Sequence, residues 1–255
     1  MSAVKTEAIL LRTHPYSESS RILRFFTLEL GLVSVIAKGG QRGASRGYGG
    51  AGAFSEGVAV FVFRETRDLQ TLREFQPVNS RFGLARDVSR LAGASAAAEL
   101  VLRHTWQEPN AGLYRAISGG LDRLEAAPPE EVLAQVLALA WTIVHTLGFG
   151  PELAACLCCG RPLDAEEMGW FEMQAGGVGG SCCPSWGGAR RIGPHAREQL
   201  KRLLAGDAPS ELRGRRAHIS LLRDFTSYHM LGGDRLSSLR FLEPDLASRG
   251  DGPRH

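Results

Sequence analysis

The chain has 255 residues, of which 44% are hydrophobic and 22% are charged, as in an ordinary globular protein of roughly one to three domains. Its 30 basic and 27 acidic side chains leave a net charge of only +3, which by itself does not indicate a nucleic-acid partner. Lysine occurs only at Lys5, Lys38 and Lys201, so arginine carries nearly all of the positive charge. Arginine suits phosphates and bases, although a GC-rich genome would produce the same bias.

The apolar stretches argue against secretion and against membrane insertion. The first one, Ala8–Leu11, is too short for a signal sequence and runs directly into Arg12. The longest, Val132–Phe149, is interrupted by polar residues, and its apolar positions step by three and four. That spacing predicts one face of a buried helix rather than a membrane span. We therefore expect a cytoplasmic protein with no membrane partner.

The chain as far as Phe75 reads as five short strands, each rich in Val, Ile, Leu, Phe or Thr and bounded by turn residues. The predicted strands are Glu7–Arg12, Arg21–Thr27, Leu32–Ala37, Val58–Arg64 and Leu69–Phe75. Five strands without an interleaved long helix predict a small closed β-barrel, and an OB-fold has that strand count. Strand count alone leaves an SH3-like barrel or an open meander as alternatives.

A glycine-rich segment, residues 38–52, separates the third and fourth predicted strands. It contains seven glycines, the cations Lys38, Arg42 and Arg46, and the aromatic Tyr48. A flexible basic loop beside a barrel can follow a phosphate backbone and become ordered on contact. A surface loop without any partner is the alternative interpretation.

From Phe82 onward the pattern becomes helical, which predicts an α+β chain with the barrel first. One apolar stripe comprises Val88, Leu91, Ser95, Ala98 and Leu102. The further predicted helices are Gly112–Glu125, Glu130–Leu147, His195–Leu204 and Ala217–Leu231. Arg213, Arg215 and Arg216 form a basic cluster before the last of them.

All five cysteines lie between positions 156 and 183, and the reducing cytosol favours a metal site over disulfides for them. The segment Cys156–Gly160 contains a Cys-x-x-Cys step followed by glycine, which is one knuckle of a zinc ribbon. The second pair, Cys182 and Cys183, lacks the matching step. Ser185 or Trp186 stands where the fourth thiolate is expected.

Three interpretations of the cysteines therefore remain open. In the first, a zinc site is closed by Cys156, Cys159, Cys182 and Cys183. In the second, His195 replaces one of these thiolates. In the third, the site has decayed and the thiols are small buried hydrophobic residues. A catalytic zinc is not expected, because no His-x-Glu pattern precedes the cysteines.

Motifs of catalysis are absent from the sequence. It contains no phosphate-binding Gly-x-x-x-x-Gly-Lys-Ser/Thr loop, no His-Glu-x-x-His and no Gly-x-Ser-x-Gly elbow. Acidic pairs such as Glu130-Glu131 and Glu166-Glu167 lie in polar stretches where solvated charge explains them. We therefore expect a protein that is not an enzyme.

The first forty residues resemble the N-terminus of the RecO family of bacterial recombinational DNA repair proteins. The matching features are the strand Ala8–Arg12, the turn Glu18–Arg21, the reversal Phe26–Gly31 and the strand end Ala37–Gly39. The later order also matches, with a helical middle, Cys-x-x-Cys-Gly, Gly-Gly before the second cysteine pair, and the late segment Leu236–Leu242. The resemblance covers almost the whole chain.

This resemblance implies an OB-fold in residues 1–80, a helical domain in 81–151 and 192–246, a zinc-ribbon-like segment in 152–191 and a flexible tail in 247–255. It implies binding of single- and double-stranded DNA and annealing of complementary strands. It also implies work with RecR in loading RecA onto DNA coated by single-strand-binding protein, at the nucleoid.

Partners and contacts follow from the same resemblance. The C-terminal tail of single-strand-binding protein is expected to dock on the helical part, where Arg197–Arg223 has a suitable composition. The expected DNA contacts are Arg12, Arg21, Arg24, Lys38, Arg42 and Arg46. Family members with an intact zinc site have Cys-x-x-Cys twice. The resemblance therefore implies zinc ligands firmly only at Cys156 and Cys159, which match the first of these motifs. A sequence-specific regulator that uses the ribbon, or a zinc-dependent nucleic-acid enzyme, is the rival hypothesis.

Overall fold

The computed structural model describes residues 2–18, 20–38, 51–184 and 187–242. Several predictions lie outside the described residues, namely those on Arg42, Arg46, Ser185, Trp186 and the tail 247–255. The chain divides into two compact units, one made of residues 1–87 with 101–126 and the other of residues 88–100 with 127–255.

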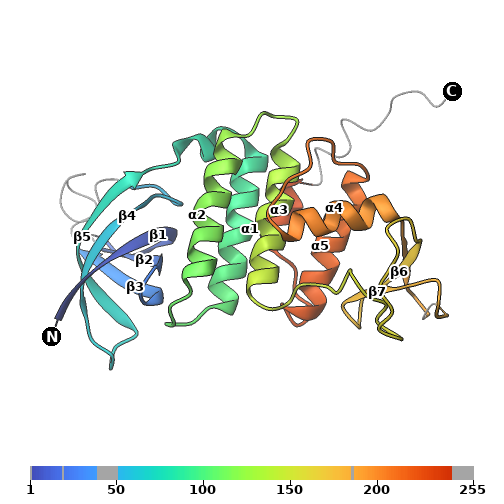
Figure 1. The fold of residues 1–255 in the computed structure, drawn as a ribbon. Helices are drawn as coiled ribbons and strands as arrows, with labels where there is room; N and C mark the ends of the chain where they lie inside the picture. Colours follow the sequence, from blue (N-terminus) through green and yellow to red (C-terminus); the bar gives the residue numbers. More distant parts are fainter. Residues whose placement is uncertain (1, 19, 39–50, 185–186, 243–255) are drawn as a thin grey trace. The chain divides into compact units, whose positions relative to one another are not determined.

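The first unit is built on a closed barrel of five strands (Figure 1). The strands are β1 (Ser2–Ser17), β2 (Ser20–Thr27), β3 (Gly31–Lys38), β4 (Glu56–Phe63) and β5 (Leu69–Asn79). Their order is β1-β2-β3-β5-β4, and β1 closes the barrel by pairing with β4. The β3–β5 pair is parallel and the others are antiparallel. This closed arrangement confirms the predicted OB-fold and excludes the open meander.

Alternating side chains fill the barrel. On β3 every second residue is buried, and the same is true of β4 from Gly57 to Phe61. The inward residues form one cluster, consisting of Ala8, Leu10, Leu23, Phe25, Val33, Val35, Ala37, Ala51, Ala59, Phe61, Leu72 and Phe75. The rings of Phe25 and Phe75 lie 4.9 Å apart at its centre. Burying each such ring stabilises the barrel by about 1.5–3 kcal/mol.

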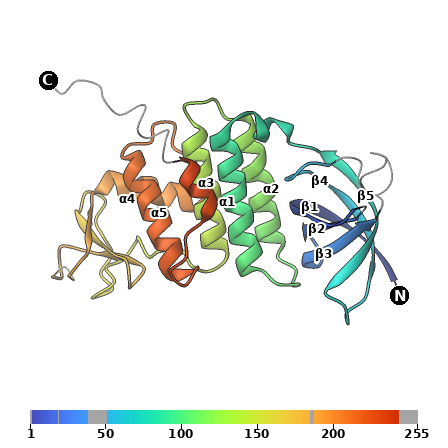
Figure 2. The same cartoon turned by 180° about the vertical axis from the view of Figure 1, so that it is seen from behind.

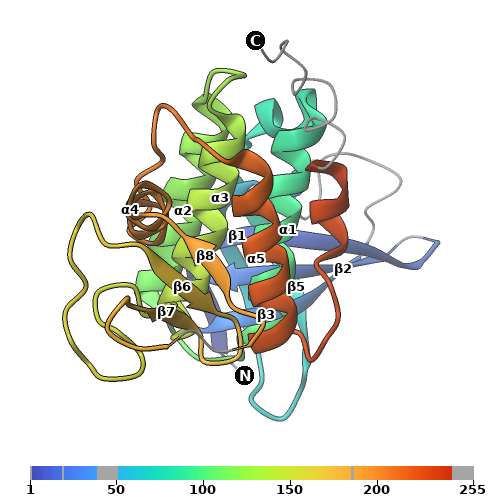
Figure 3. The same ribbon diagram turned by 90° about the vertical axis from the view of Figure 1, so that its right-hand side faces the viewer.

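Strand β1 is much longer than the predicted Glu7–Arg12, because it begins at Ser2 and stays extended as far as Ser17. Pro15 pairs with Arg21 instead of ending the strand. Proline is tolerated there because β1 pairs with β4 only from Ser2 to Ile9. Among the described residues the second half of β1 is thus paired on one side only, and we call its other side the free edge of β1. The hairpin of β1 and β2 extends away from the other strands (Figure 3).

Helix α2 (Ala111–Ala126) belongs to the same compact unit as the barrel, together with the 3-10 helix η1 (Phe82–Arg86). Its Tyr114 stacks on Phe26 of β2 with the ring centroids 6.3 Å apart. The domain boundary expected at residue 80 remains a prediction. Residues 101–126 are mainly helical, but their contacts place them in the same compact unit as the barrel.

A buried arginine links β4 to α2. The Arg81 side chain is fully buried and donates to Oδ1 of Asp122 at 2.7 Å, to the carbonyl of Phe54 at 3.0 Å, and to the carboxylate of Glu56. Glu56 also accepts from the Tyr114 hydroxyl at 2.9 Å and from the Ser118 hydroxyl at 2.6 Å. These bonds hold the helix on the barrel and satisfy each buried charge.

The second unit is mainly helical. Its helices are the first part of α1 (Val88–His104), α3 (Val132–Thr146), α4 (Pro194–Leu204), α5 (Arg215–His229) and the 3-10 helix η2 (Ser237–Leu242). Helix α3 is buried along most of its length and packs against α4 and α5 (Figures 1 and 2). The ring of its Trp141 lies 5.3 Å from that of Phe225 on α5.

The apolar face predicted for α1 is confirmed only at Ala98. Val88 and Leu91 are 65% and 42% exposed, and the buried positions of the helix include Leu100, Val101 and a set of alanines. The buried alanines are Ala92, Ala94, Ala96, Ala97 and Ala98. Small residues win here because α1 and α3 approach closely, so that a Cβ on Gly93 would lie 2.3 Å from Cγ2 of Val136.

A small three-stranded sheet precedes α4. Its strands β6 (Gly169–Glu172), β7 (Gly177–Gly179) and β8 (Arg190–Ile192) run in the order β7-β6-β8 (Figure 3). Phe171 of β6 packs edge-on against Phe225 of α5, with centroids 6.1 Å apart. Nε2 of His229 bonds the carbonyl of Met173 at 2.7 Å, which fixes the β6–β7 turn. Among the described residues, no helix combines the length and apolar character needed to span a bilayer.

Candidate nucleic-acid interface and metal centre

Two of the predicted DNA-contacting arginines face each other across the first two strands. Arg12 of β1 and Arg24 of β2 are direct partners, just beyond a register shift after Leu10. Directly opposed residues share one face of a sheet. Since Leu23 and Phe25 point into the barrel core, the alternation on β2 places Arg24, and with it Arg12, on the outer side. We call this side of β1, β2, β3 and β5 the outer face.

Neither arginine is neutralised within the described part of the chain. No ion pair joins Arg12 or Arg24 to a carboxylate there, and Nε of Arg24 is buried without a hydrogen-bond partner. Burial, and after it the charge of Arg12, lowers the pKa of Arg24. Opposed like charges destabilise a sheet. The repulsion between Arg12 and Arg24 therefore lowers the stability of this part of the barrel, and a bound anion would neutralise it.

The register extends the outer face across four strands. One row runs from Arg12 through Arg24 to Ser34 and Leu69. The next row runs from His14 through Ile22 and Ile36 to Thr71. Lys38 is exposed on the same side, opposite Ser20 and about 13 Å along the strands from the level of Arg24. The face thus has cations at both ends and an apolar middle.

Arg21 is not brought onto this face. It pairs with Ala37, which points into the barrel core, so it lies on the opposite side of β2 from Arg24. Its Nε is also buried without a partner among the described residues. Of the six predicted contacts, three share the outer face, one lies on the other side of the strand, and the remaining two fall outside the described residues.

Two further residues near this face were missed from the sequence. Arg73 of β5 is exposed two positions after Thr71, at a register shift where Arg73 and Glu74 are both exposed. Tyr16 of β1 is 60% exposed. Tyr16 was not predicted from the sequence, because the serines and the proline around it are typical of a turn rather than of a strand.

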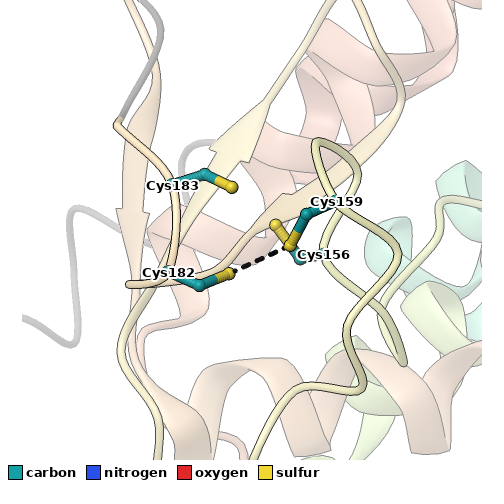
Figure 4. Close-up of side chains that lie close together, drawn as sticks. All are labelled: Cys156, Cys159, Cys182 and Cys183. Atoms are coloured by element: carbon teal, nitrogen blue, oxygen red, sulfur yellow. Dashed lines mark hydrogen bonds between the residues drawn. The ribbon is translucent and has the colours of Figure 1, made fainter.

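Two loops bring four cysteines together in the second unit. The first turns at Gly160, whose φ is +72° and whose N–H donates to the carbonyl of Cys156 at 2.8 Å. The second follows Gly180, whose N–H points at Sγ of Cys156 at 3.3 Å. A Cβ at Gly180 would lie 2.6 Å from a methyl carbon of Leu163 and 2.9 Å from Oε1 of Glu167, so a larger residue would have to displace both side chains. Figure 4 shows the four side chains, which come from these two loops.

The sulfur positions suit one metal ion. The Sγ atoms of the four cysteines all lie within 4.8 Å of one another, with Cys159 and Cys182 3.4 Å apart. Four thiolates around a tetrahedral zinc are about 3.8 Å apart. The four cysteines are Cys156, Cys159, Cys182 and Cys183. His195 is not part of this group, and Cys159 and Cys182 are exposed, unlike small core hydrophobic residues.

A carboxylate orders the second cysteine loop. Glu167 accepts from the backbone N–H of Ser181 at 2.7 Å, from its hydroxyl at 2.6 Å and from Arg161 at 2.6 Å. The Ser181 bonds lower the pKa of Glu167 to about 2. Such outer partners hold metal ligands in place. Arg161 also raises the positive potential beside Cys182, to whose sulfur it donates.

A pocket of about 320 Å³ opens between β8 and the start of α5, within the second unit. Its floor is apolar and includes Phe171, Ile192 and Leu221, and three arginines line it. They are Arg190, Arg191 and Arg213. Arg190 and Arg213 already pair with Asp224 and Glu211, respectively. Helix α5 begins at the pocket without a side-chain cap or an acidic residue in its first turn, which favours an anion.

The pocket also contains a buried hydrogen-bond acceptor. Gln199 donates from Nε2 to the carbonyl of Glu211 at 2.7 Å, so its Oε1 is left to accept from Nε2 of His218 at 3.3 Å. His218 is 4% exposed, and its Nδ1 has no partner in the described residues. Burial lowers the pKa of His218, with a smaller effect from His195. The ring is therefore neutral near pH 7, and its Nδ1 is enclosed by the protein.

An OB-fold barrel with an unneutralised cationic face, in one chain with a helical unit that carries a four-cysteine ribbon, defines a multidomain OB-fold protein. Residues 1–81 match the family model described as "Recombination protein O N terminal", and residues 85–238 match "Recombination protein O C terminal". The chain therefore belongs to the RecO family of recombinational DNA repair proteins.

Individual relatives agree with this. The chain is similar to "DNA repair protein RecO" of Heliobacterium modesticaldum, with 33% identity over 227 residues, covering 88% of this chain and 81% of the relative. It is also similar to "DNA repair protein RecO" of Anaeromyxobacter dehalogenans strain 2CP-C, with 30% identity over 254 residues, covering 95% and 97%. A role in DNA repair follows from the family.

Proposed function

We propose that this protein is a non-catalytic recombination mediator that binds single- and double-stranded DNA and anneals complementary strands. With RecR it would help to load RecA onto DNA covered by single-strand-binding protein, in the cytoplasm at the nucleoid. The proposed DNA contacts are Arg12, Arg21, Arg24, Lys38, Arg42 and Arg46. Annealing needs no covalent step, because cations that neutralise the phosphates of both strands lower their repulsion and release counterions.

The opposed arginines Arg12 and Arg24 carry this proposal. Two like charges that face each other without a neighbouring carboxylate lower the stability of the fold. Destabilising arrangements of this kind are expected at functional sites, where a bound ligand compensates for them. A phosphate backbone laid along the outer face would neutralise both charges and reach Lys38. The rival regulator would instead require base-specific contacts and paired half-sites.

Salt dependence tests the electrostatic mechanism. If about five phosphates are neutralised, the log–log slope of single-strand affinity against salt is expected to be about −3.5. Arg24→Gln should reduce the magnitude of this slope by about 0.7, and relief of the opposed charges should raise the free energy of unfolding by up to about 1 kcal/mol. Fluorescence anisotropy and urea unfolding measure the two effects.

Lys201→Gln is the matched control, since this residue lies on α4 in the other compact unit. It should leave both the slope and the unfolding midpoint unchanged. A slope near zero for the unmodified protein would contradict the proposed function. Affinity that depends strongly on sequence, with a palindromic preference, would favour the regulator.

Zinc is the metal that the cysteine set fits best, and we propose that Cys156, Cys159, Cys182 and Cys183 hold it. Four thiolates form a closed tetrahedral site, which leaves no position for substrate and so supports a structural role. The ion would supply folding energy to the ribbon, while Glu167 and Arg161 orient its second loop.

The pocket beside α5 fits the C-terminal tail of single-strand-binding protein, and we propose it as the docking site. An apolar terminal side chain would enter the floor formed by Phe171 and Leu221, while its carboxylate meets the helix N-terminus and Arg191. Unlike its two arginine neighbours, Arg191 has no carboxylate partner among the described residues.

A labelled tail peptide tests the docking site by fluorescence anisotropy. Arg191→Glu is expected to weaken binding of the peptide about tenfold or more, because a repulsive charge replaces an attractive one. The same peptide with an amidated C-terminus should bind the unmodified protein as weakly as the free-acid peptide binds the Arg191→Glu variant. Equal affinity of the acid and amide forms would rule out this pocket, and single-strand DNA affinity should stay unchanged in either case.

A further inference from the structure

The middle of the outer face is apolar although it lies outside the barrel core. Ile22 and Ile36 oppose each other across β2 and β3 and are only half-buried. Their outer neighbours in the row are His14 and Thr71, so no formal charge stands in it. A phosphate group forms no favourable contact with such a surface. A group with a flat apolar face binds to it favourably, because the contact removes apolar area from water.

Tyr16 lies on the β1–β2 hairpin, next to the row that joins Ser17, Ser20 and Lys38 at the end of the outer face. Pro15 pairs with Arg21 and Ser17 with Ser20, so the register shift leaves Tyr16 as the extra residue of a β-bulge. Its side chain is 60% exposed. No hydrogen bond or ring contact joins it to any residue that the structure describes. The fold therefore leaves an aromatic ring open to solvent on a hairpin that also carries cations.

Cations border these apolar groups on both sides. Arg12 and Arg24 occupy the neighbouring row, and Lys38 lies beyond Ile36 along β3. A backbone that followed the cations would bring its bases over the isoleucines and toward the hairpin. Only an unpaired strand can present its base faces in this way, because a duplex keeps them stacked inside.

We infer that the outer face binds bases as well as phosphates: Tyr16 stacks on an unpaired base of single-stranded DNA, and Ile22 and Ile36 support its neighbours. This inference rests on the proposed DNA binding and adds a preference for single strands over duplex. Stacking tolerates every base, since each has a π-face, so the preference is for strandedness and not for sequence.

Fluorescence anisotropy with three probes of equal length tests the inference: an oligo-dT strand, the same strand with abasic sites, and a duplex. Tyr16→Ala should weaken oligo-dT binding by about 5-fold to 100-fold. It should leave the affinities for the abasic strand and the duplex unchanged. Tyr16→Phe should retain oligo-dT affinity, because the ring and not the hydroxyl makes the contact.

Tyr228→Ala is the matched control, because Tyr228 is 53% exposed on α5 and lies in the other compact unit. It should change none of the three affinities. Equal losses on the oligo-dT and abasic strands, or a loss in Tyr16→Phe as large as in Tyr16→Ala, would overturn the stacking role. So would unchanged oligo-dT binding by Tyr16→Ala.

The result also separates this inference from the proposed function. If Arg24→Gln weakens binding to all three probes while Tyr16→Ala weakens none, the cationic face stands and the stacking inference falls. If the unmodified protein binds no probe at low salt, the proposed function fails and the inference fails with it.

Discussion

Arg81→Ala is expected to lower the free energy of unfolding by about 3–5 kcal/mol. The substitution removes the cation that holds Glu56 on β4 and Asp122 on α2, and it leaves a carboxylate in a site where the arginine was fully buried. Most of the loss should come from Glu56, whose side chain is 19% exposed, because Asp122 is 47% exposed and water screens it. The shift of the urea-unfolding midpoint measures the loss.

Arg202→Ala provides the comparison. Its Nε lies 2.7 Å from Asp207, as close as Arg81 lies to Asp122, but both partners are exposed at 42% and 60%. A surface pair of this kind contributes little to stability because water screens it, so Arg202→Ala should shift the unfolding midpoint far less than Arg81→Ala. Similar losses in the two variants would show that the network around Arg81 does not hold α2 on the barrel. A double-mutant cycle with Glu56→Ala would then give a coupling energy near zero.

Cys159→Ser is expected to abolish metal binding and to unfold the ribbon around β6 and β7. Serine is a poor zinc ligand, and the free energy of binding a structural zinc is largely the folding energy of its site. Elemental analysis should find one zinc per chain in the unmodified protein and close to none in the variant. Hydrogen exchange should show lost protection at Phe171 and Val178, which pair across β6 and β7.

Cys158→Ser is the control for this experiment, because Cys158 is exposed and lies outside the group of four sulfurs. It should keep the full zinc content and the same exchange pattern. The barrel belongs to the other compact unit, so single-strand affinity should survive in both variants. Absence of zinc from the unmodified protein would contradict the proposed metal site directly.

The sequence predicted the five barrel strands because their alternation is regular and glycine or polar turns end them. It did not predict the length of β1, because Pro15 and the serines around it resemble a turn. Only the three-dimensional pairing reveals that this half of the strand has a free edge, where proline costs no ladder bond. The apolar face of α1 was predicted only in part, for another reason. Val88 and Leu91 are large and apolar, but the close approach of α3 buries alanines, which carry a weaker hydrophobic signal in the sequence.

The candidate sites were predictable to different degrees. Cysteine spacing identified the four sulfurs, since ligands of one ion follow simple sequence rules. The supporting Glu167 was not predictable, because its bonds to Ser181 depend on how two loops meet. The pocket beside α5 was predictable in part: the expected segment Arg197–Arg223 supplies its α5 side, whereas Phe171 and Arg190–Ile192 come from β6 and β8. Which cations share a face required the strand register, which separates Arg21 from Arg24.

The free edge of β1 also bears on how the protein behaves at high concentration. An unpaired strand edge is a template on which a second molecule can add its own strand and begin to aggregate. Pro15 offers no N–H to such a newcomer, and Arg12 repels an identical strand by charge. Arg12, which we assign to nucleic acid, and the neighbouring Pro15 would therefore also keep separate copies of the protein from associating when no DNA is present.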